Sequence, residues 1–141
     1  RDDILLKPGK LTAEEFETMK QHTIIGHDIL KDSPSKFLQM GGIIALGHHE
    51  KFDGTGYPYG KKGEEIPMEA RIVAIADVYD ALVSERPYKN AWSTEAAIDY
   101  MKTHSGKHFD PDCLNAFEEQ LDTVLKIQGM LPDMHAVSQK L

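Results

Sequence analysis

The sequence predicts an all-α fold, because a pattern of helical segments separated by helix breakers recurs along its 141 residues. Apolar residues return at three- and four-residue spacing, and clusters of Gly and Pro separate these periodic stretches. The first stretch opens with Thr12 and Glu15, which are spaced as a capping box. At 40% apolar and 28% charged residues, the chain has the composition of a globular domain.

The first two predicted helices lie before residue 51. The first runs from Thr12 to about Leu30, and the second runs from about Ser35 to Glu50, with Pro34 in the break between them. Helical spacing predicts an inward stripe on the first helix, formed by Phe16, Met19, His22, Ile25, Gly26 and Ile29. It predicts one buried face on the second helix, formed by Phe37, Gly41, Ile44, Ala45 and His48.

Residues 51–66 have no periodicity, and a loop of this length is uncommon in a compact domain unless it has a function. Pro67 can begin the third helix, which extends to about Ser84. We expect its inner face to consist of Val73, Ala76, Asp77, Asp80 and Ala81.

Two further helices complete the prediction. Ser93 caps a helix that reaches about Thr103, and Asp110 opens a last long helix that continues through Gln128. We expect Trp92 and Phe109 to lie in the core. Residues 1–128 then form the domain, and residues 129–141 form a weakly patterned tail.

Composition excludes several classes of protein. A formal net charge of −7 disfavours binding of a nucleic-acid polymer through bulk electrostatics. No apolar run approaches membrane-spanning length, so no membrane contact is expected in this segment. The lone Cys113 excludes an internal disulfide and fits a cytoplasmic location. Because residue 1 is Arg rather than Met, we expect the chain to be a piece of a longer protein.

Four side chains on the predicted inward faces are candidate metal ligands: His22, His48, His49 and Asp77. Imidazole and carboxylate ligands together suit iron, manganese, zinc or nickel. We therefore expect these side chains to converge, although a single inward His is more often a satisfied core residue. Asp77 and Asp80 also have an alternative, which is ion pairing with Arg71 or Arg86.

Five sequence blocks in order resemble the HD-GYP family, an all-helical branch of the HD phosphohydrolases. The blocks are residues 49–58 (HEKFDGTGYP), 63–67 (GEEIP), 71–82 (RIVAIADVYDAL), 86–89 (RPYK) and 106–111 (GKHFDP). Residues 4–12 and the pair Met19 and His22 also match. The resemblance implies a compact HD-type helical bundle that hydrolyses the bacterial second messenger cyclic di-GMP. It also implies two or three divalent metal ions, most often iron or manganese, that activate water for attack at phosphorus.

The resemblance assigns roles residue by residue. It implies that His22, His48 and His49 hold one metal ion and that Asp77 completes the neighbouring site. It further implies that Tyr57 lies beside the ligand, so Tyr57 is assigned to the substrate contacts. Among the substrate contacts, Arg86 and Lys89 match positions that meet phosphate and guanine, and Asp80 is assigned to this group as a supporting residue.

The chain departs from the family pattern at its start. The family's His-Asp pair and the following lysine precede the segment that matches residues 7–9, and no counterpart precedes it here. Residues 27–31 spell His-Asp-x-x-Lys but follow His22, so we interpret His27 as part of a solvated helix end. We therefore assign no catalytic residue within this chain and expect the fragment alone to be inactive.

Two other functions remain open from the sequence. One is a non-catalytic module that binds a cyclic dinucleotide or a protein, and the other is an HD phosphohydrolase for a different phosphoester. The expected partners are cyclic di-GMP and an upstream receiver or sensory domain, and homodimerisation is left open.

Overall fold

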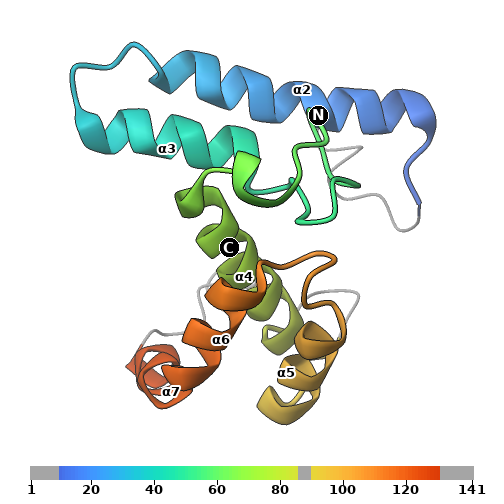
Figure 1. The fold of residues 1–141 in the computed structure, drawn as a ribbon, viewed down its shortest axis with the longest axis vertical. Coiled ribbons are helices and arrows are strands. Elements are labelled where there is room, and N and C mark those ends of the chain that lie inside the picture. The colour runs from blue at the N-terminus through green and yellow to red at the C-terminus, as the bar shows by residue number, and fades with distance from the viewer. Residues whose placement is uncertain (1–9, 86–89, 131–141) are drawn as a thin grey trace, which may run out of the picture.

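The computed structural model describes residues 10–85 and 90–130, and the regular structure in these residues is helical (Figure 1). This confirms the predicted all-α fold. The helices are α2 (Ala13–Leu30), α3 (Lys36–Gly47), α4 (Met68–Val83), α5 (Thr94–Thr103), α6 (Pro111–Glu119) and α7 (Leu121–Met130), and a short 3₁₀ helix, η1 (Gly63–Glu65), interrupts the long loop. None of these helices is both long enough and apolar enough to cross a membrane.

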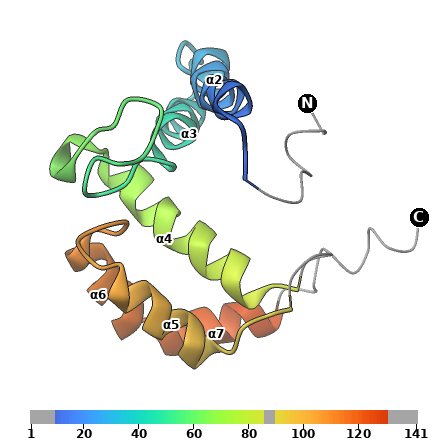
Figure 2. The same cartoon turned by 90° about the vertical axis from the view of Figure 1, so that its right-hand side faces the viewer.

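The helices form two groups that α4 connects. Helices α2 and α3 lie side by side as an antiparallel hairpin, and α5, α6 and α7 lie along one side of α4 (Figures 1 and 2). The loop between α3 and α4 folds beside the C-terminal end of α3 (Figure 2). This arrangement brings the end of α3, which carries His48 and His49, close to α4, which carries Asp77.

The contact between α2 and α3 is made by small residues. A Cβ atom on Gly26 would lie 3.3 Å from the Cβ of Ala45, so the two helices approach closely at this point. The predicted capping box is present, since Thr12 Oγ1 accepts from the Glu15 amide and the Glu15 carboxylate accepts from the Thr12 amide. The start of α2 was therefore predictable from its cap.

The predicted inward faces of this hairpin are right only in part, since Gly26 lies against Ala45 and Gly41 lies against Leu30 as expected. Ile25 and Ile29 are 53% and 72% exposed, and Phe37 is 86% exposed. The face of α2 that meets α3 carries Gly26, as predicted, together with His27 and Leu30, because close packing at the glycines selects it.

The main core lies between α4, α5 and α6. Its buried members are Ile75, Tyr79, Leu82, Ala97, Ile98, Met101, Phe109 and Leu114. The predicted inner face of α4 is therefore wrong as well, because Ala76, Asp77 and Asp80 are exposed. Most of α4 is apolar around its circumference, so periodicity alone does not determine which side is buried.

Caps define the last helices. Ser93 Oγ accepts from the Ala96 amide, as its position predicted. The predicted final helix is divided at Gln120 into α6 and α7, and α7 extends to Met130, two residues past the predicted helix end at Gln128. Phe109 is 1% exposed as expected, whereas Trp92 is 39% exposed and packs edge-on against Tyr100.

Candidate metal centre

His48 lies at the C-terminal end of α3, opposite Asp77 of α4. Gly47 allows this approach, because a Cβ atom there would lie 2.8 Å from the Cβ of Ala70 on α4. The Nε2 atom of His48 is 3.9 Å from Oδ2 of Asp77, and both side chains have solvent access. An imidazole nitrogen and a carboxylate oxygen from two helices thus face one another.

Hydrogen bonds determine which nitrogen of two histidines is available. Nδ1 of His48 lies 2.8 Å from the carbonyl oxygen of Ile44, and Nδ1 of His22 lies 2.9 Å from that of Thr18. A carbonyl oxygen only accepts, so each Nδ1 carries the proton and each neutral ring presents a lone pair at Nε2. This is the tautomer that a metal ligand requires when the metal approaches Nε2.

His49 is held between His48 and the loop. Its ring centroid is 4.0 Å from that of His48 and 4.9 Å from that of Tyr57, on which it stacks. Burial, together with the neighbouring His48 and His108, lowers the pKa of His49 to about 4. The ring is therefore neutral at neutral pH, which keeps its lone pair available.

The loop after His49 folds back onto the histidines. A Cβ atom on Gly56 would lie 2.3 Å from the amide nitrogen of Lys51, so only glycine fits there. The Tyr57 amide donates to the carbonyl of His49 at 3.2 Å, the Tyr57–Pro58 peptide is cis, and the Tyr57 ring also meets Phe16 of α2. Tyr57 thus joins α2 to the end of α3.

The four predicted ligands do not converge as expected. Within residues 10–85 and 90–130, no three His, Cys, Asp or Glu side chains are close enough to hold a metal ion. His48 has His49 and Asp77 as neighbours, but His22 is exposed on α2. The expectation of a preassembled cluster is wrong, because His22, which was expected on the inward stripe of α2, lies on an exposed side of that helix.

The remaining predicted site residues have separate positions. Asp80 is exposed and accepts a hydrogen bond from Ser84 Oγ at 3.1 Å. Arg86 and Lys89 lie outside the described residues. His27 is not a solvated helix end: it is partly buried and its Nδ1 atom is enclosed, since α2 turns this residue toward Gly42 of α3.

Comparison with known proteins identifies the family. The HD domain family matches residues 3–113. The chain belongs to the HD domain family. It is 56% identical over 115 residues to a cyclic di-GMP phosphodiesterase response regulator of Xanthomonas campestris, covering 82% of this chain and 30% of that protein. It is 51% identical over 134 residues to a cyclic di-GMP phosphodiesterase of Thermotoga maritima, covering 95% of this chain and 34% of that protein.

A solved structure supports the same fold for this HD domain. The crystal structure of a cyclic GMP-AMP specific phosphodiesterase of Vibrio cholerae matches with a TM-score of 0.68 at 24% identity. The match covers 99% of this chain and 30% of the other chain. The HD domain described here is thus related to HD-GYP cyclic di-GMP phosphodiesterases, and it spans about a third of their length.

Glu50 and Arg71 hold the surroundings of the candidate centre in this HD domain, and the contacts that each makes were not predicted. Glu50 is only 2% exposed, and its carboxylate accepts from the amides of Tyr59 at 2.7 Å and Lys61 at 3.0 Å. It therefore anchors the loop that carries Tyr57. Arg71 pairs with Asp110 rather than with Asp77 or Asp80, so the ion-pair alternative for those acids does not involve Arg71. A carboxylate next to a Gly-rich loop was the available signal for Glu50.

The donors of this HD domain fit a divalent metal ion in chemical type. His48 presents Nε2 toward the Asp77 carboxylate, and neutral His49 lies beside it. Nitrogen and carboxylate oxygen ligands of this kind suit transition metals and zinc. A metal bound here would need at least one more ligand brought into place.

Proposed function

We propose that this HD domain is part of a metal-dependent phosphodiesterase that hydrolyses cyclic di-GMP. The observation that carries the proposal is the approach of His48 Nε2 to the Asp77 carboxylate, with the Nδ1 proton already held by Ile44. Sequence identity of 51–56% to proteins named cyclic di-GMP phosphodiesterases supports the choice of substrate.

The proposal gives each residue a task. His22, His48, His49 and Asp77 would hold the metal ions, of which the resemblance implies two or three, with iron or manganese preferred and zinc or nickel as alternatives. When bound, such ions supply an activated water and neutralise charge on phosphate. Tyr57 fixes the plane of His49 by stacking. Asp80, Arg86 and Lys89 would orient the substrate, with Arg86 suited to a bidentate phosphate contact.

The proposed full-length protein has more parts than this chain. The chain covers 30% of a relative that is named a response regulator, which supports an upstream receiver or sensory domain. We propose that residues 1–128 act as the HD unit of that protein and that turnover requires parts outside the chain.

A second substrate is favoured by one specific observation. The chain is 42% identical over 132 residues to a 3′3′-cGAMP-specific phosphodiesterase of Vibrio cholerae. Cyclic GMP-AMP differs from cyclic di-GMP in one base, so contacts with guanine decide between the two. Comparing kcat/KM for both cyclic dinucleotides with the full-length protein distinguishes these functions.

The test compares two variants of the full-length protein. His49→Ala removes a proposed ligand, so metal content and cyclic di-GMP turnover should fall together. Arg86→Ala leaves the ligands in place and removes a charge-assisted contact with phosphate. It should lower kcat/KM roughly ten- to hundredfold at unchanged metal content, as expected for a contact worth about 1.5–3 kcal/mol.

Two outcomes would contradict these roles. Equal metal loss in both variants would show that Arg86 supports the metal centre and not the substrate. Full turnover by the His49→Ala variant would exclude His49 as a ligand, and it would remove the main argument for the centre. His104→Gln at the end of α5 serves as a histidine control that should retain both metal and activity.

A further inference from the structure

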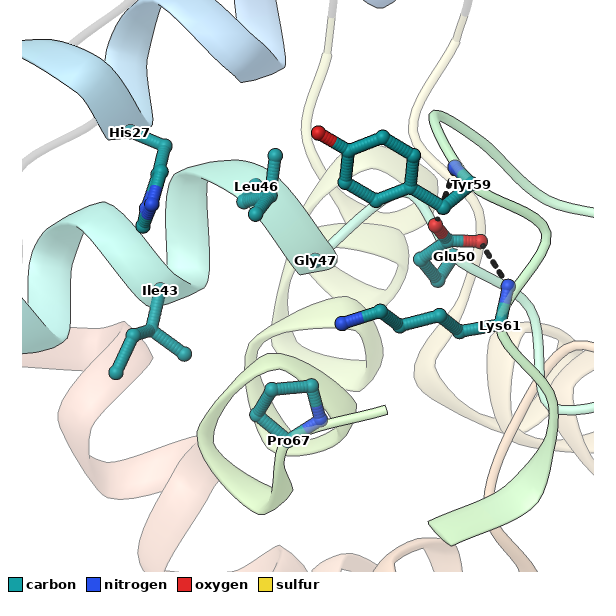
Figure 3. Close-up of a pocket in the computed structure, with 8 residues that line it drawn as sticks. All are labelled: His27, Ile43, Leu46, Gly47, Glu50, Tyr59, Lys61 and Pro67. Atoms are coloured by element: carbon teal, nitrogen blue, oxygen red, sulfur yellow. Dashed lines mark hydrogen bonds between the residues drawn. The ribbon is translucent and has the colours of Figure 1, made fainter. Parts of the chain in front are cut away.

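A pocket of about 230 Å³ lies beside α3, apart from the proposed metal centre (Figure 3). Its apolar wall is formed by Ile43 and Leu46 of α3 and by Pro67 before α4. Tyr59 and Lys61 of the loop form its rim, and His27 of α2 lies at one end (Figure 3). The pocket thus combines an apolar wall with an aromatic ring and a cation.

This pocket and the candidate metal centre use different sides of α3. At 100° per residue, Ile43, Leu46 and Gly47 share one side of the helix, while Ile44 and His48 share the other. None of the residues that line the pocket is a predicted ligand or a predicted substrate contact. A molecule bound in the pocket would therefore not occupy the position of a metal ion.

Lys61 supplies the charge of the pocket. Its backbone amide is fixed by Glu50, and its side chain extends between Tyr59 and Pro67 (Figure 3). Its Nζ atom lies 6.0 Å from the centre of the Tyr59 ring, and no carboxylate in the described part of the chain is within ion-pairing distance of it. The nearby Glu50 carboxylate is already bonded to two backbone amides. The ammonium group is therefore available for an external anion.

Two other features of the pocket bear on its ligand, and the exposed ring of Tyr59 favours a planar one. Tyr59 is 60% exposed, so a face of its ring can stack against an aromatic group. His27 lines the pocket, and its Nδ1 atom is the buried side-chain nitrogen that lacks a hydrogen-bond partner among the described residues. The pocket is smaller than the 300–1,000 Å³ typical of sites for drug-sized molecules, so a cyclic dinucleotide is not its expected ligand.

We propose that this pocket binds a small aromatic carboxylate, with the ring on Ile43 and Leu46 beside Tyr59 and the carboxylate on Lys61. The pocket is thus a second ligand site, distinct from the proposed phosphodiesterase centre.

The test titrates the chain with indole-3-acetate and with indole-3-acetamide, its neutral analogue. Isothermal titration calorimetry gives the affinities, and NMR chemical-shift changes at Ile43 and Leu46, compared with those at His49 and Tyr57, give the location. Indole-3-acetate should bind about tenfold more tightly than the amide, a difference of about 1.4 kcal/mol. Lys61→Met should remove this preference, whereas Lys62→Met, an equal charge change at an exposed neighbour, should retain it.

A third variant tests the aromatic contact. Tyr59→Ala should weaken both ligands equally, and because Tyr59 is largely exposed, the fold should be unaffected. Equal affinity of the wild-type chain for the acid and the amide would overturn the proposal, as would the absence of binding. Chemical-shift changes confined to His49 and Tyr57 would place the ligand in the metal centre and would also overturn it.

Discussion

Arg71 of α4 and Asp110, the N-cap residue of α6, form a buried ion pair that joins the two helices. Their side chains are 10% and 6% exposed. Arg71 Nε also donates to the carbonyl of Ile66 at 2.9 Å, and Asp110 Oδ1 accepts from the amide of Asp112 at 2.8 Å. One carboxylate therefore caps α6 and binds the helix that carries Asp77.

We predict that Asp110→Ala destabilises the domain by about 3–5 kcal/mol, because it leaves the Arg71 charge buried without a partner. Loss of the α6 cap adds to this. Glu118→Gln is the matched control, since its ion pair with Lys102 is more exposed and should contribute no more than about 1 kcal/mol. Urea unfolding measures both, and equal effects of the two variants would contradict the prediction.

The same pair predicts a dependence of stability on pH. Burial raises the pKa of Asp110, but hydrogen bonds from Arg71 and from the Cys113 and Asp112 amides outweigh it, so the pKa is lowered overall. A lowered folded-state pKa contributes stability that is present above the unfolded-state value, near 3.9, and is lost as the pH falls through the folded-state value.

Unfolding free energies of the wild type and of Asp110→Asn, measured between pH 3 and pH 7, should therefore converge as the pH falls below about 4. A constant difference across this range would mean that the Asp110 carboxylate does not titrate differently in the two states.

Gly56→Ala should disrupt the loop, because its Cβ atom would overlap the backbone of Lys51 and His49. We expect a loss of about 1–3 kcal/mol, as for overpacking in a core, and the loss of the Tyr57 ring-current shift on His49 in NMR spectra. Gly129→Ala is the control. It lies in α7 with open space around it, so it should be neutral or slightly stabilising.

Addition of Zn²⁺ or Ni²⁺ should raise the melting temperature of the chain, because a metal that binds only the folded state stabilises it. His48→Ala should abolish this shift, and His104→Gln should not change it. His22→Ala provides the sharper comparison. A reduced shift would show that metal binding recruits His22, and an unchanged shift would remove it from the ligand set. Substantial cyclic di-GMP turnover by the chain alone would contradict the expected need for additional parts.

Caps and helix breakers were the dependable signals in the sequence. Thr12, Ser93 and Asp110 each begin a helix where their side chains predicted, because capping is a local interaction. The buried faces were not predictable in the same way. On α2 the contact with α3 depends on Gly26 and on a close approach of two helices, which is a property of the packing and not of apolar periodicity.

The candidate site was predictable in part for the same reason. The adjacency of His48, His49 and Tyr57 follows from a short, Gly-rich segment, whose geometry is local. The approach of Asp77 to His48 depends on how α4 meets α3, and the sequence indicated it through the expected inward placement of both residues and through resemblance to a family. The position of His22 was wrong because its helix is rotated relative to the predicted stripe.

The hairpin of α2 and α3 has few fully buried residues, namely Thr23, Gly42 and Gly47. Segments with so little buried apolar surface open more readily than the core of a domain. Each opening of the hairpin away from α4 would separate His48 from Asp77. A metal ion bound by both side chains would hold the hairpin against α4. Metal occupancy and the protection of the hairpin amides from hydrogen exchange should therefore increase and decrease together.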